Sequence, residues 1–481
     1  MRIIQQILKH KAVPTLVSAA LMQLAFAPMN LFLLVFVALV PWLHALSDTD
    51  RRGAWRSGLL FGTVFWLVQC WWIVPFVGRW TGSVGMALIP WLLIPLLVVW
   101  FFGLLGIMLH ACIQRDWLLA IPLAWGGIEA LRSTFPGLAF PWGLLASPLT
   151  GIPWLIQNAS YGEVFFVSAW VALVNVIVWQ LFQRPDRQRL MTPILVCAAL
   201  LLLSVVRYSR EVVGDRVVVT IGQPGVDLAF GDPASSNAKA LQAAREIVAQ
   251  ASGNGSRFIV LPEGIAAQGA DISPGATVPV LYGGVREESG KSHQSAFVRL
   301  PSGEVQWADK TRLVMFGEYV PFRRQLSFLK GFNLPSADLS PGATAQSIEI
   351  AGLRGGALLC FEGLFPDVAR KMADQGSRFL AIMSIDDWYA GTPAIPQLAD
   401  GAIWRSIETG LPTLRSASTG VSRVIDAKGH EIVRAPLGAN VAMRAEVVMP
   451  AGSDTFRFRH FFGWFGLLVG LGALLLPKER P

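Results

Sequence analysis

The sequence predicts an α/β domain joined to a bundle of membrane-spanning helices. Of its 481 residues, 53% are hydrophobic and 18 are tryptophan, and the mean hydropathy is +0.49. These values are too apolar for a soluble protein, so we expect much of the chain to lie in lipid. Between residues 207 and 457 the pattern changes to short apolar strands that alternate with amphipathic helices, which is typical of an α/β domain.

Eight apolar stretches approach the length that a helix needs to cross a bilayer core of roughly 30 Å. They lie at about 12–28, 30–46, 57–77, 84–112, 117–133, 164–183, 190–206 and 460–477. The N-terminus, which ends in Ala25-Phe26-Ala27, would also suit a secretory signal, but a second apolar run follows almost at once. We therefore expect transmembrane helices 1–7 in residues 1–206, a polar domain in 207–457, and helix 8 with a cytoplasmic tail in 458–481.

Basic residues predict the orientation of these helices. If the N-terminus is cytoplasmic, the short outer loops hold only Arg79 and Arg132, against a much larger cytoplasmic set. By the positive-inside rule, the polar domain then lies outside the inner membrane, in the periplasm of a bacterium with two membranes. Acidic and basic residues nearly balance in 207–459, so the formal charge of +8 belongs to the membrane part and indicates no nucleic-acid partner. The cytoplasmic set is Arg2, Lys9, Lys11, Arg51, Arg52, Arg56, Arg115, Arg184, Arg187, Arg189, Lys478 and Arg480.

The four cysteines, Cys70, Cys112, Cys197 and Cys360, are too few and too scattered for a disulfide framework or a metal cluster. Three of them lie inside apolar runs, which leaves Cys360 for chemistry in water. No histidine pair has metal-ligand spacing, and no glycine-rich phosphate loop follows a strand. We expect neither a metal nor another cofactor.

Cys360 stands in GGALLCFEGLF, where a short apolar strand gives way to a loop. Upstream, Glu263 follows the apolar strand in FIVLPEG, and Lys310 stands in WADKTRLVMFGEYVPF. Taken singly, these residues would be a small buried hydrophobe, a loop carboxylate and a surface lysine. Together they supply a thiol, a base and a cation, the groups that nucleophilic acyl transfer requires.

These segments resemble the nitrilase, or carbon-nitrogen hydrolase, superfamily, whose catalytic triad is Glu-Lys-Cys in this order. Within it, GEYVP after the lysine, CFE at the cysteine, and SIDDWYAGTPAIPQ followed by RSIETGLPTLRSASTGVSRVID are most similar to the apolipoprotein N-acyltransferases. The resemblance implies a nitrilase-like α-β-β-α sandwich joined to an eight-helix transmembrane bundle. It also implies transfer of an acyl chain from a membrane phospholipid, through a cysteine thioester, to the N-terminal diacylglyceryl-cysteine of an apolipoprotein.

The resemblance assigns catalytic roles to Glu263, Lys310 and Cys360. A thiol with an ordinary pKa near 8.5 needs a base, which Glu263 would supply, and Lys310 would stabilise the oxyanion. Glu318 and Glu362 match further carboxylates near the triad, which would position Lys310 and shape the charge around the thiolate. Structural salt bridges are the alternative for these two residues.

Three positions depart from the family pattern. Phe361 replaces the usual tyrosine after the cysteine, Ile385 replaces an asparagine, and Leu398 replaces a histidine. A lost hydroxyl and a lost amide would weaken binding of the acyl acceptor or mark a diverged paralogue. Two other readings therefore stay open: a membrane-tethered amidase or nitrilase that hydrolyses a small C–N substrate, and a non-catalytic membrane scaffold or transporter. For the acyltransferase we expect a monomer.

Four further features lie near the predicted membrane or the site. Glu129 and Arg132 share one helix face, three residues apart, and we expect an ion pair between them. The connector 134–160 is unusually apolar and would lie in the interface or line a lipid entrance. Residues 321–335 mix basic and aromatic side chains, which suits a lipid surface, and 386–396 would form part of the pocket rim.

Overall fold

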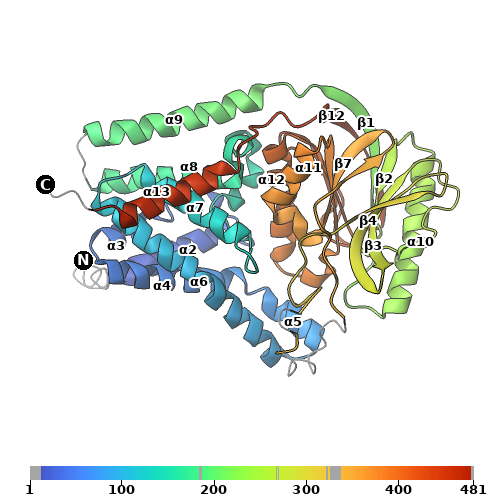
Figure 1. Cartoon of the computed structure of the whole chain (residues 1–481), viewed down its shortest axis with the longest axis horizontal. Helices are drawn as coiled ribbons and strands as arrows, with labels where there is room; N and C mark the ends of the chain where they lie inside the picture. The colour runs from blue at the N-terminus through green and yellow to red at the C-terminus, as the bar shows by residue number, and fades with distance from the viewer. Residues whose placement is uncertain are drawn as a thin grey trace. The chain divides into compact units, whose positions relative to one another are not determined.

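The computed structural model describes residues 12–183, 187–266, 268, 270–320, 323–325 and 337–477. The chain forms two compact units (Figure 1). The helical unit contains Met1–Pro75, Val84–Arg210 and Phe456–Pro481, and the sheet unit contains Phe76–Ser83 and Glu211–Thr455. A short segment from the N-terminal half, Phe76–Ser83, therefore packs with the sheets rather than with the helices on either side of it in sequence.

Every apolar stretch of the sequence contains helical structure, but the number of membrane crossings is not settled by helix length. Among the described residues, three helices, α6, α8 and α9, are long and apolar enough to span a bilayer, and a fourth span results if α4 and α5, bent by 52°, are counted together. Others are apolar but shorter, such as α2 and α13. The helices are α2 (Ala12–Ala25), α3 (Val40–Ser47), α4 (Arg51–Gln69), α5 (Ile73–Thr81), α6 (Val84–Gln114), α7 (Ala120–Thr134), α8 (Ala159–Phe182), α9 (Arg187–Ser209) and α13 (Phe461–Leu475).

Small residues allow helices α4 and α6 of the helical unit to pack closely. A side chain at Gly58 of α4 would lie 2.1 Å from the backbone oxygen of Phe102 of α6, and one at Gly106 would lie 2.5 Å from the oxygen of Ala54. Such close approach is possible only where Cβ atoms are missing, as in other packed membrane helices. The crossing of α4 and α6 therefore depends on these two glycines.

The expected ion pair between Glu129 and Arg132 is wrong. Both side chains are buried, and no direct ion pair joins them among the described residues. Glu129 Oε1 instead accepts hydrogen bonds from the backbone N–H of Leu145 (2.7 Å) and from Trp125 (2.9 Å), and Arg132 donates to the carbonyl oxygen of Phe140 (2.5 Å). Backbone groups of a buried connector need hydrogen-bond partners, and here the two charged side chains provide them instead of pairing with each other. The two side chains thus fasten the connector 134–160 to α7.

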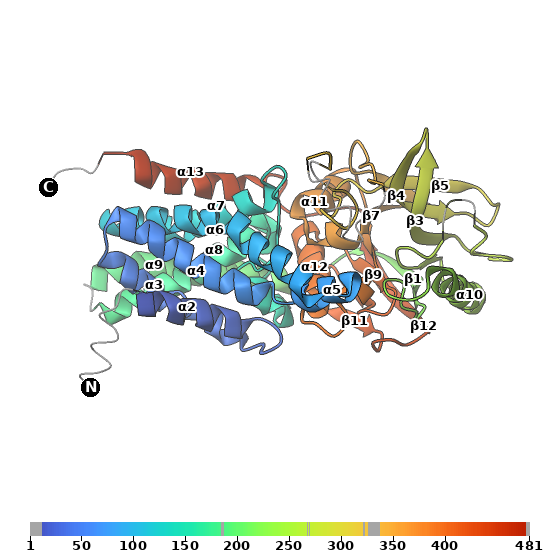
Figure 2. The same ribbon diagram turned by 90° about the horizontal axis from the view of Figure 1, so that it is seen from below.

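The sheet unit is a four-layer sandwich (Figures 1 and 2). Its two six-stranded sheets have the orders β12-β1-β2-β3-β4-β5 and β11-β10-β9-β8-β7-β6. Phe258 of one sheet stacks on Phe379 of the other, with ring centroids 5.1 Å apart, so the apolar core lies between the sheets. Helix α10 (Pro233–Ser252) covers one outer face, and α11 (Pro366–Asp374) and α12 (Ala394–Thr409) cover the other.

The strands follow the apolar runs of the sequence, with four additions. The predicted strands near 216–221, 257–261, 278–284, 294–300, 356–360, 378–384, 413–418 and 421–426 are confirmed as β1 (Gly214–Gln223), β2 (Phe258–Val260), β3 (Val280–Glu288), β4 (Lys291–Arg299), β7 (Leu353–Leu359), β8 (Phe379–Ser384), β9 (Thr413–Ala417) and β10 (Arg423–Ile425). The additional strands are β5 (Val305–Asp309), β6 (Ser347–Ile350), β11 (Glu431–Arg434) and β12 (Val441–Pro450). Three of these, β5, β6 and β11, are short and contain polar residues at or next to a sheet edge, where the apolar pattern is weak.

Two expected surface features have different outcomes. The basic and aromatic segment 321–335 lies outside the described residues except for 323–325. The connector 134–160 contains two 3-10 turns, Ser147–Gly151 and Pro153–Leu155. Its placement in an interface stays a prediction.

Candidate active site

The chemically active side chains of the sheet unit gather where strands end. Cys360 follows β7, Glu263 follows β2 by three residues, and Lys310 comes directly after β5. The loops after the parallel strands β2 and β7 leave the sheets at their carboxyl ends, the usual location of functional groups in α/β folds. Glu263 is 3% exposed, Lys310 is 2% exposed and Cys360 is 7% exposed, so the site is shielded from water.

The backbone at Cys360 is strained. Its φ is +51°, in the left-handed region that residues with a side chain seldom adopt. The residue begins a 3-10 turn, Cys360–Leu364, directly after the extended strand. Such strain at a buried thiol is typical of functional positions, because the surrounding structure must maintain it.

Lys310 lies between two carboxylates. Its Nζ atom is 2.6 Å from Glu318 Oε1 and 3.5 Å from Glu263 Oε1. Burial lowers the pKa of Lys310, but the charges of Glu263 and Glu318 outweigh this effect and the pKa is raised well above its ordinary value. Lys310 therefore remains a cation, and its ammonium group lies at the centre of the cluster.

Glu263 and Cys360 are electrostatic neighbours in this cluster. Burial raises the pKa of the Glu263 carboxyl to about 7, although Lys310 opposes the shift. Burial also raises the pKa of the Cys360 thiol to about 12; the charge of Glu263 adds to this effect and that of Lys310 opposes it. Near neutral pH the resting site thus holds a thiol beside a carboxyl group that is close to half ionised.

Glu362 ties the turn at Cys360 to the loop after Lys310. Its Oε1 atom accepts hydrogen bonds from the backbone N–H groups of Thr311 (2.8 Å) and Arg312 (3.0 Å) and from the Thr311 hydroxyl (2.9 Å), and Oε2 accepts from the N–H of Leu359 (3.0 Å). Burial raises the pKa of this carboxyl, whereas Lys310 and the N–H donors lower it. These hydrogen bonds of Glu362 go to backbone N–H groups and to the Thr311 hydroxyl, not to the Cys360 thiol. The buried carboxylate therefore holds the backbone in place.

The three departures from the family pattern have separate surroundings. The half-buried Phe361 ring packs edge-on against Phe365, with centroids 5.6 Å apart. Ile385 lies beside Gly264, where an added Cβ would be 2.7 Å from its Cδ1 atom. Leu398 is buried in α12 and only 3% exposed. Each apolar side chain therefore packs against protein, and the fold requires no polar group at these positions.

A second buried polar group, which the sequence did not single out, adjoins the thiol. Ser384 Oγ donates to Asp386 Oδ1 at 2.6 Å, and the interaction of Ser384 with Cys360 lowers the pKa of the thiol, against the larger effect of burial. Arg415 donates to both carboxylate oxygens of Asp386 at 2.9 Å. Ser384 and Asp386 are completely buried and Arg415 is 1% exposed. The sequence signals were the apolar run that ends at Ser384, the last residue of β8, and the predicted pocket rim that begins at Asp386.

Aromatic side chains from three parts of the sheet unit meet at the segment 386–390. Trp388 contacts Phe230, Phe76 and Trp80, with ring centroids 5.5, 6.1 and 6.3 Å away. The guanidinium group of Arg79 donates to the carbonyl oxygen of Ala390 at 2.6 Å. Tyr389, next in sequence to Trp388, is buried and interacts electrostatically with Cys360. Residues 76–80 thus hold the segment that adjoins Cys360.

Comparison with known proteins covers both units. Residues 18–177 match the model of the apolipoprotein N-acyltransferase N-terminal domain, and residues 219–449 match the model of the carbon-nitrogen hydrolases. Proteins named apolipoprotein N-acyltransferase from Geobacter metallireducens and Allorhizobium ampelinum are each 27% identical to this chain, and each alignment covers 93% of it and 91% of the relative. An amidase from Nesterenkonia sp. has 16% identity over 50% of this chain and 95% of its own, with a TM-score of 0.37.

The matches to the two models follow one another along the chain, and the relatives align over nearly their full length. The fold of the sheet unit, two sheets between outer helices, agrees with the second model. Over both units, the chain is therefore similar to the apolipoprotein N-acyltransferases, and its sheet unit to the carbon-nitrogen hydrolases.

Proposed function

We propose that this protein moves an acyl chain from a membrane phospholipid, through a thioester on Cys360, to the α-amino group of the N-terminal diacylglyceryl-cysteine of apolipoproteins. The observation that carries the proposal is the combination of a buried Glu263, Lys310 and Cys360 cluster with a membrane domain of this family in one chain. A hydrolase of small soluble substrates would have no use for the membrane domain.

In the first half-reaction, Glu263 accepts the proton of the Cys360 thiol while the sulfur attacks an ester carbonyl of the phospholipid. The resulting oxyanion is stabilised by the ammonium group of Lys310, a type of contact worth about 3 kcal/mol in known acyl-transfer sites. Collapse of the tetrahedral intermediate breaks the C–O bond, and protonated Glu263 returns its proton to the departing alkoxide. The products are a lysophospholipid and the acyl thioester.

In the second half-reaction, the neutral α-amino group of the apolipoprotein attacks the thioester carbonyl. Lys310 again stabilises the oxyanion, and Glu263 accepts the proton that the nitrogen loses as the amide forms. The C–S bond breaks, and proton transfer from Glu263 restores the thiol. The raised pKa of Glu263, about 7, supports both roles because the group can gain and lose a proton near neutral pH.

Glu318 and Glu362 support this chemistry from opposite sides. Glu318 accepts from Lys310 at 2.6 Å and from the backbone N–H of Val314 at 2.8 Å, so it would fix the position of the ammonium group. Glu362 would hold the strained turn at Cys360 against the Lys310 loop. Phe361 would contribute an apolar wall rather than the hydroxyl that the family pattern has there.

The proposed setting is the bacterial inner membrane, with eight crossings and the sheet unit in the periplasm. Support comes from helical structure in all eight apolar stretches and from the excess of basic residues on the predicted cytoplasmic side. Because a thioester hydrolyses in water, the burial of Cys360 would also protect the intermediate until the amine arrives.

Mass spectrometry of the purified full-length protein tests the proposal. After incubation with a phospholipid that carries a labelled acyl chain, we expect one labelled acyl group on Cys360, and its transfer to a synthetic diacylated lipopeptide added afterwards. Cys360→Ala should carry no label. Label that leaves Cys360 as free fatty acid at the same rate with and without lipopeptide would favour a hydrolase, and absence of label on the wild type under all conditions would favour a non-catalytic protein.

A further inference from the structure

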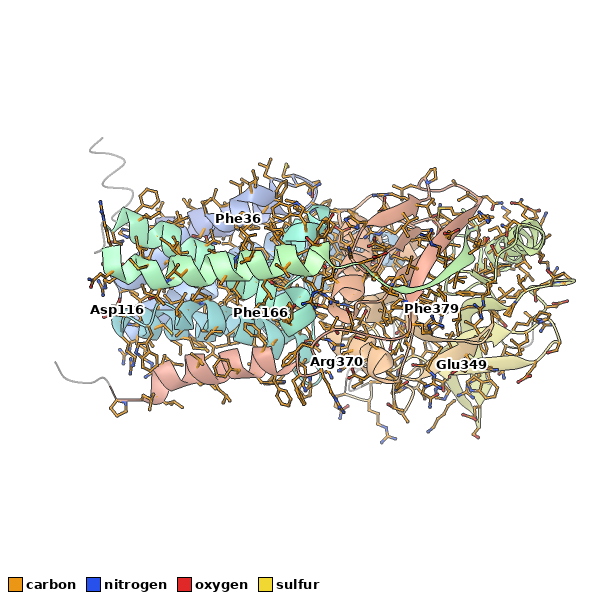
Figure 3. The ribbon with its side chains drawn as sticks, turned by 90° about the horizontal axis from the view of Figure 1, so that it is seen from above. Phe36, Asp116, Phe166, Glu349, Arg370 and Phe379 are labelled. Carbon is orange, nitrogen blue, oxygen red and sulfur yellow. The ribbon has the colours of Figure 1, made fainter. Side chains whose placement is uncertain are left out.

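The helical unit contains a cavity that the proposed reaction does not use. It has a volume of about 350 Å³ and lies among the first turn of α4 and the last turns of α6 and α13. Asp116, two residues beyond the end of α6, marks this end of the helical unit in Figure 3. A volume of this size suits part of a small organic ligand.

One wall of the cavity is basic and polar. It is formed by Arg51 of α4, by His110 and Gln114 of α6, and by Arg115, which follows α6. His110 Nδ1 lies 3.0 Å from the carbonyl oxygen of Leu46, so this ring is already held in place. Gln114 is similarly bound to the C-terminal end of α3. The wall is therefore built before any ligand arrives.

The two arginines at the cavity lack a negative counter-charge among the described residues. Arg115 donates to the carbonyl oxygen of Leu476 and lies 5.9 Å over the ring of Trp117, and neither partner is charged. No acidic side chain pairs with Arg51 in the part of the chain that the structure describes. The neighbouring acid Asp116 is paired with Arg189 instead. The cavity therefore presents an uncompensated positive potential.

The N-terminus of α4 strengthens this potential. Arg51 is the first residue of that helix, where the unpaired backbone N–H groups carry partial positive charge. One of them, that of Gly53, is satisfied by the side chain of Asp50 at 2.8 Å. Asp50 thus contributes one negative charge at the helix start, which the arginines of the first two turns outnumber.

The remaining lining of the cavity, its second wall, is apolar. It consists of Ile107 and Ala111 of α6 and of Ala473 and Leu474 in the last turn of α13. A free anion such as phosphate gains nothing from such a wall. A molecule with an anionic head and a hydrocarbon chain would satisfy both walls, because its oxygens would contact the arginines and its chain would lie along α6 and α13.

We propose that this cavity binds the phosphate group of an anionic phospholipid. In the proposed orientation it lies at the cytoplasmic face, so its occupant belongs to the leaflet opposite the periplasmic active site and is not the acyl donor. Basic pockets between membrane helices at the cytoplasmic side are suited to such headgroups. The bound lipid would join the ends of α4, α6 and α13, and its phosphate would offset the repulsion between Arg51 at the start of α4 and Arg115 after α6.

Native mass spectrometry of the full-length protein, titrated with phosphatidylglycerol, phosphatidylcholine or inorganic phosphate, tests this site. We expect retention of phosphatidylglycerol in preference to phosphatidylcholine, and no comparable retention of inorganic phosphate. Near a membrane surface each arginine contributes on the order of 1 kcal/mol to binding of anionic lipid, so Arg51→Gln should weaken retention about fivefold. Because Arg51 makes no ion pair among the described residues, we expect this variant to fold normally.

The matched control is Arg52→Gln, which removes the same charge from the next position of α4; both arginines are exposed, but Arg52 does not line the cavity. We expect less than about a twofold effect there, because this side chain is not among those that would contact the phosphate group. Equal retention of phosphatidylglycerol by the wild type and Arg51→Gln would overturn the proposal, as would equal losses in the two variants. Phosphate binding as tight as that of the lipid would overturn the assignment to a phospholipid. Acylation of Cys360 in Arg51→Gln should match the wild type, which separates this site from the proposed donor site.

Discussion

Cys360 and Ser384 are neighbours at the carboxyl ends of two adjacent parallel strands. The pairing of Leu359 with Met383 sets their register, so the residue after β7 lies beside the last residue of β8. Ser384 has one hydroxyl proton, which it donates to Asp386 in the resting site. Ser384 nevertheless lowers the pKa of the Cys360 thiol, and we expect its proton to turn toward the sulfur when a thiolate forms.

This relationship predicts that Ser384→Ala slows acylation of Cys360. Hydrogen bonds to charged groups contribute about 1.5–3 kcal/mol, so we expect a loss of about tenfold or more in the rate of thioester formation. The rate can be followed by mass spectrometry of the labelled adduct. Ser384→Thr keeps the hydroxyl and should recover part of the rate. Equal rates in the wild type and Ser384→Ala would show that the hydroxyl does not assist the sulfur.

Asp386→Asn should destabilise the folded protein. The substitution leaves the buried Arg415 without its carboxylate partner, a change that typically costs about 3–5 kcal/mol. Thermal unfolding of the purified protein should show a clearly lowered midpoint. The double variant Asp386→Asn with Arg415→Met removes both charges and should be less destabilised than the single variant. A double variant that is more destabilised would contradict this account.

Acylation of Cys360 should rise as pH increases through about 7, where Glu263 loses its proton. Only the ionised carboxylate can accept the thiol proton, so the rate should reach a plateau above that pH. Initial rates of adduct formation at a series of pH values check this expectation. Glu263→Gln should be almost inactive at every pH. A rate that is flat across this range would remove Glu263 from the role of base.

The same pKa shift also predicts how Glu263 affects stability. Because its pKa is raised on folding, the folded protein holds this proton more tightly than the unfolded chain does. Its contribution to stability is therefore complete below the ordinary pKa of 4.5 and is lost as pH rises to about 7. Unfolding midpoints of Glu263→Gln, measured beside the wild type, should lack this part of the pH dependence.

Lys310→Met should reduce the rate of acylation by about 10²–10³-fold, the usual result of removing one donor from an oxyanion site. It should also raise the pKa of Glu263 further, because Lys310 opposes the effect of burial there. The residual activity should consequently shift to higher pH. A variant with a lowered rate and an unchanged pH profile would show that Lys310 and Glu263 are not electrostatically coupled.

The sequence predicts best those parts of the molecule that depend on local patterns. Uninterrupted apolar runs marked β7 and β8, and a strand end is a natural position for Cys360. Helix α12 was missed because Pro396 in its first turn and Gly401 in its middle weaken the helical signal. Convergence of Ser384, Asp386 and Arg415 depends on strand order and register, which no local pattern contains.

The Glu129 and Arg132 prediction failed for a related reason. Spacing along a helix shows which side chains share a face, but it does not show which backbone groups of a distant connector will approach them. In the structure the backbone N–H of Leu145 donates to Glu129, and the backbone carbonyl of Phe140 accepts from Arg132. Apolar runs likewise do not give helix length: the runs at 12–28 and 460–477 form α2 and α13, which are shorter than the helices α6, α8 and α9 that can span a bilayer.

The inclusion of residues 76–83 in the sheet unit has a practical consequence for protein production. A water-soluble fragment cut from the chain at 207 and 457 would lack this peptide and would uncover Trp388 and the carbonyl oxygen of Ala390. Exposed indole surface next to the nucleophile invites aggregation during expression and purification. Grafting the octapeptide onto such a fragment through a flexible linker would supply the missing cover.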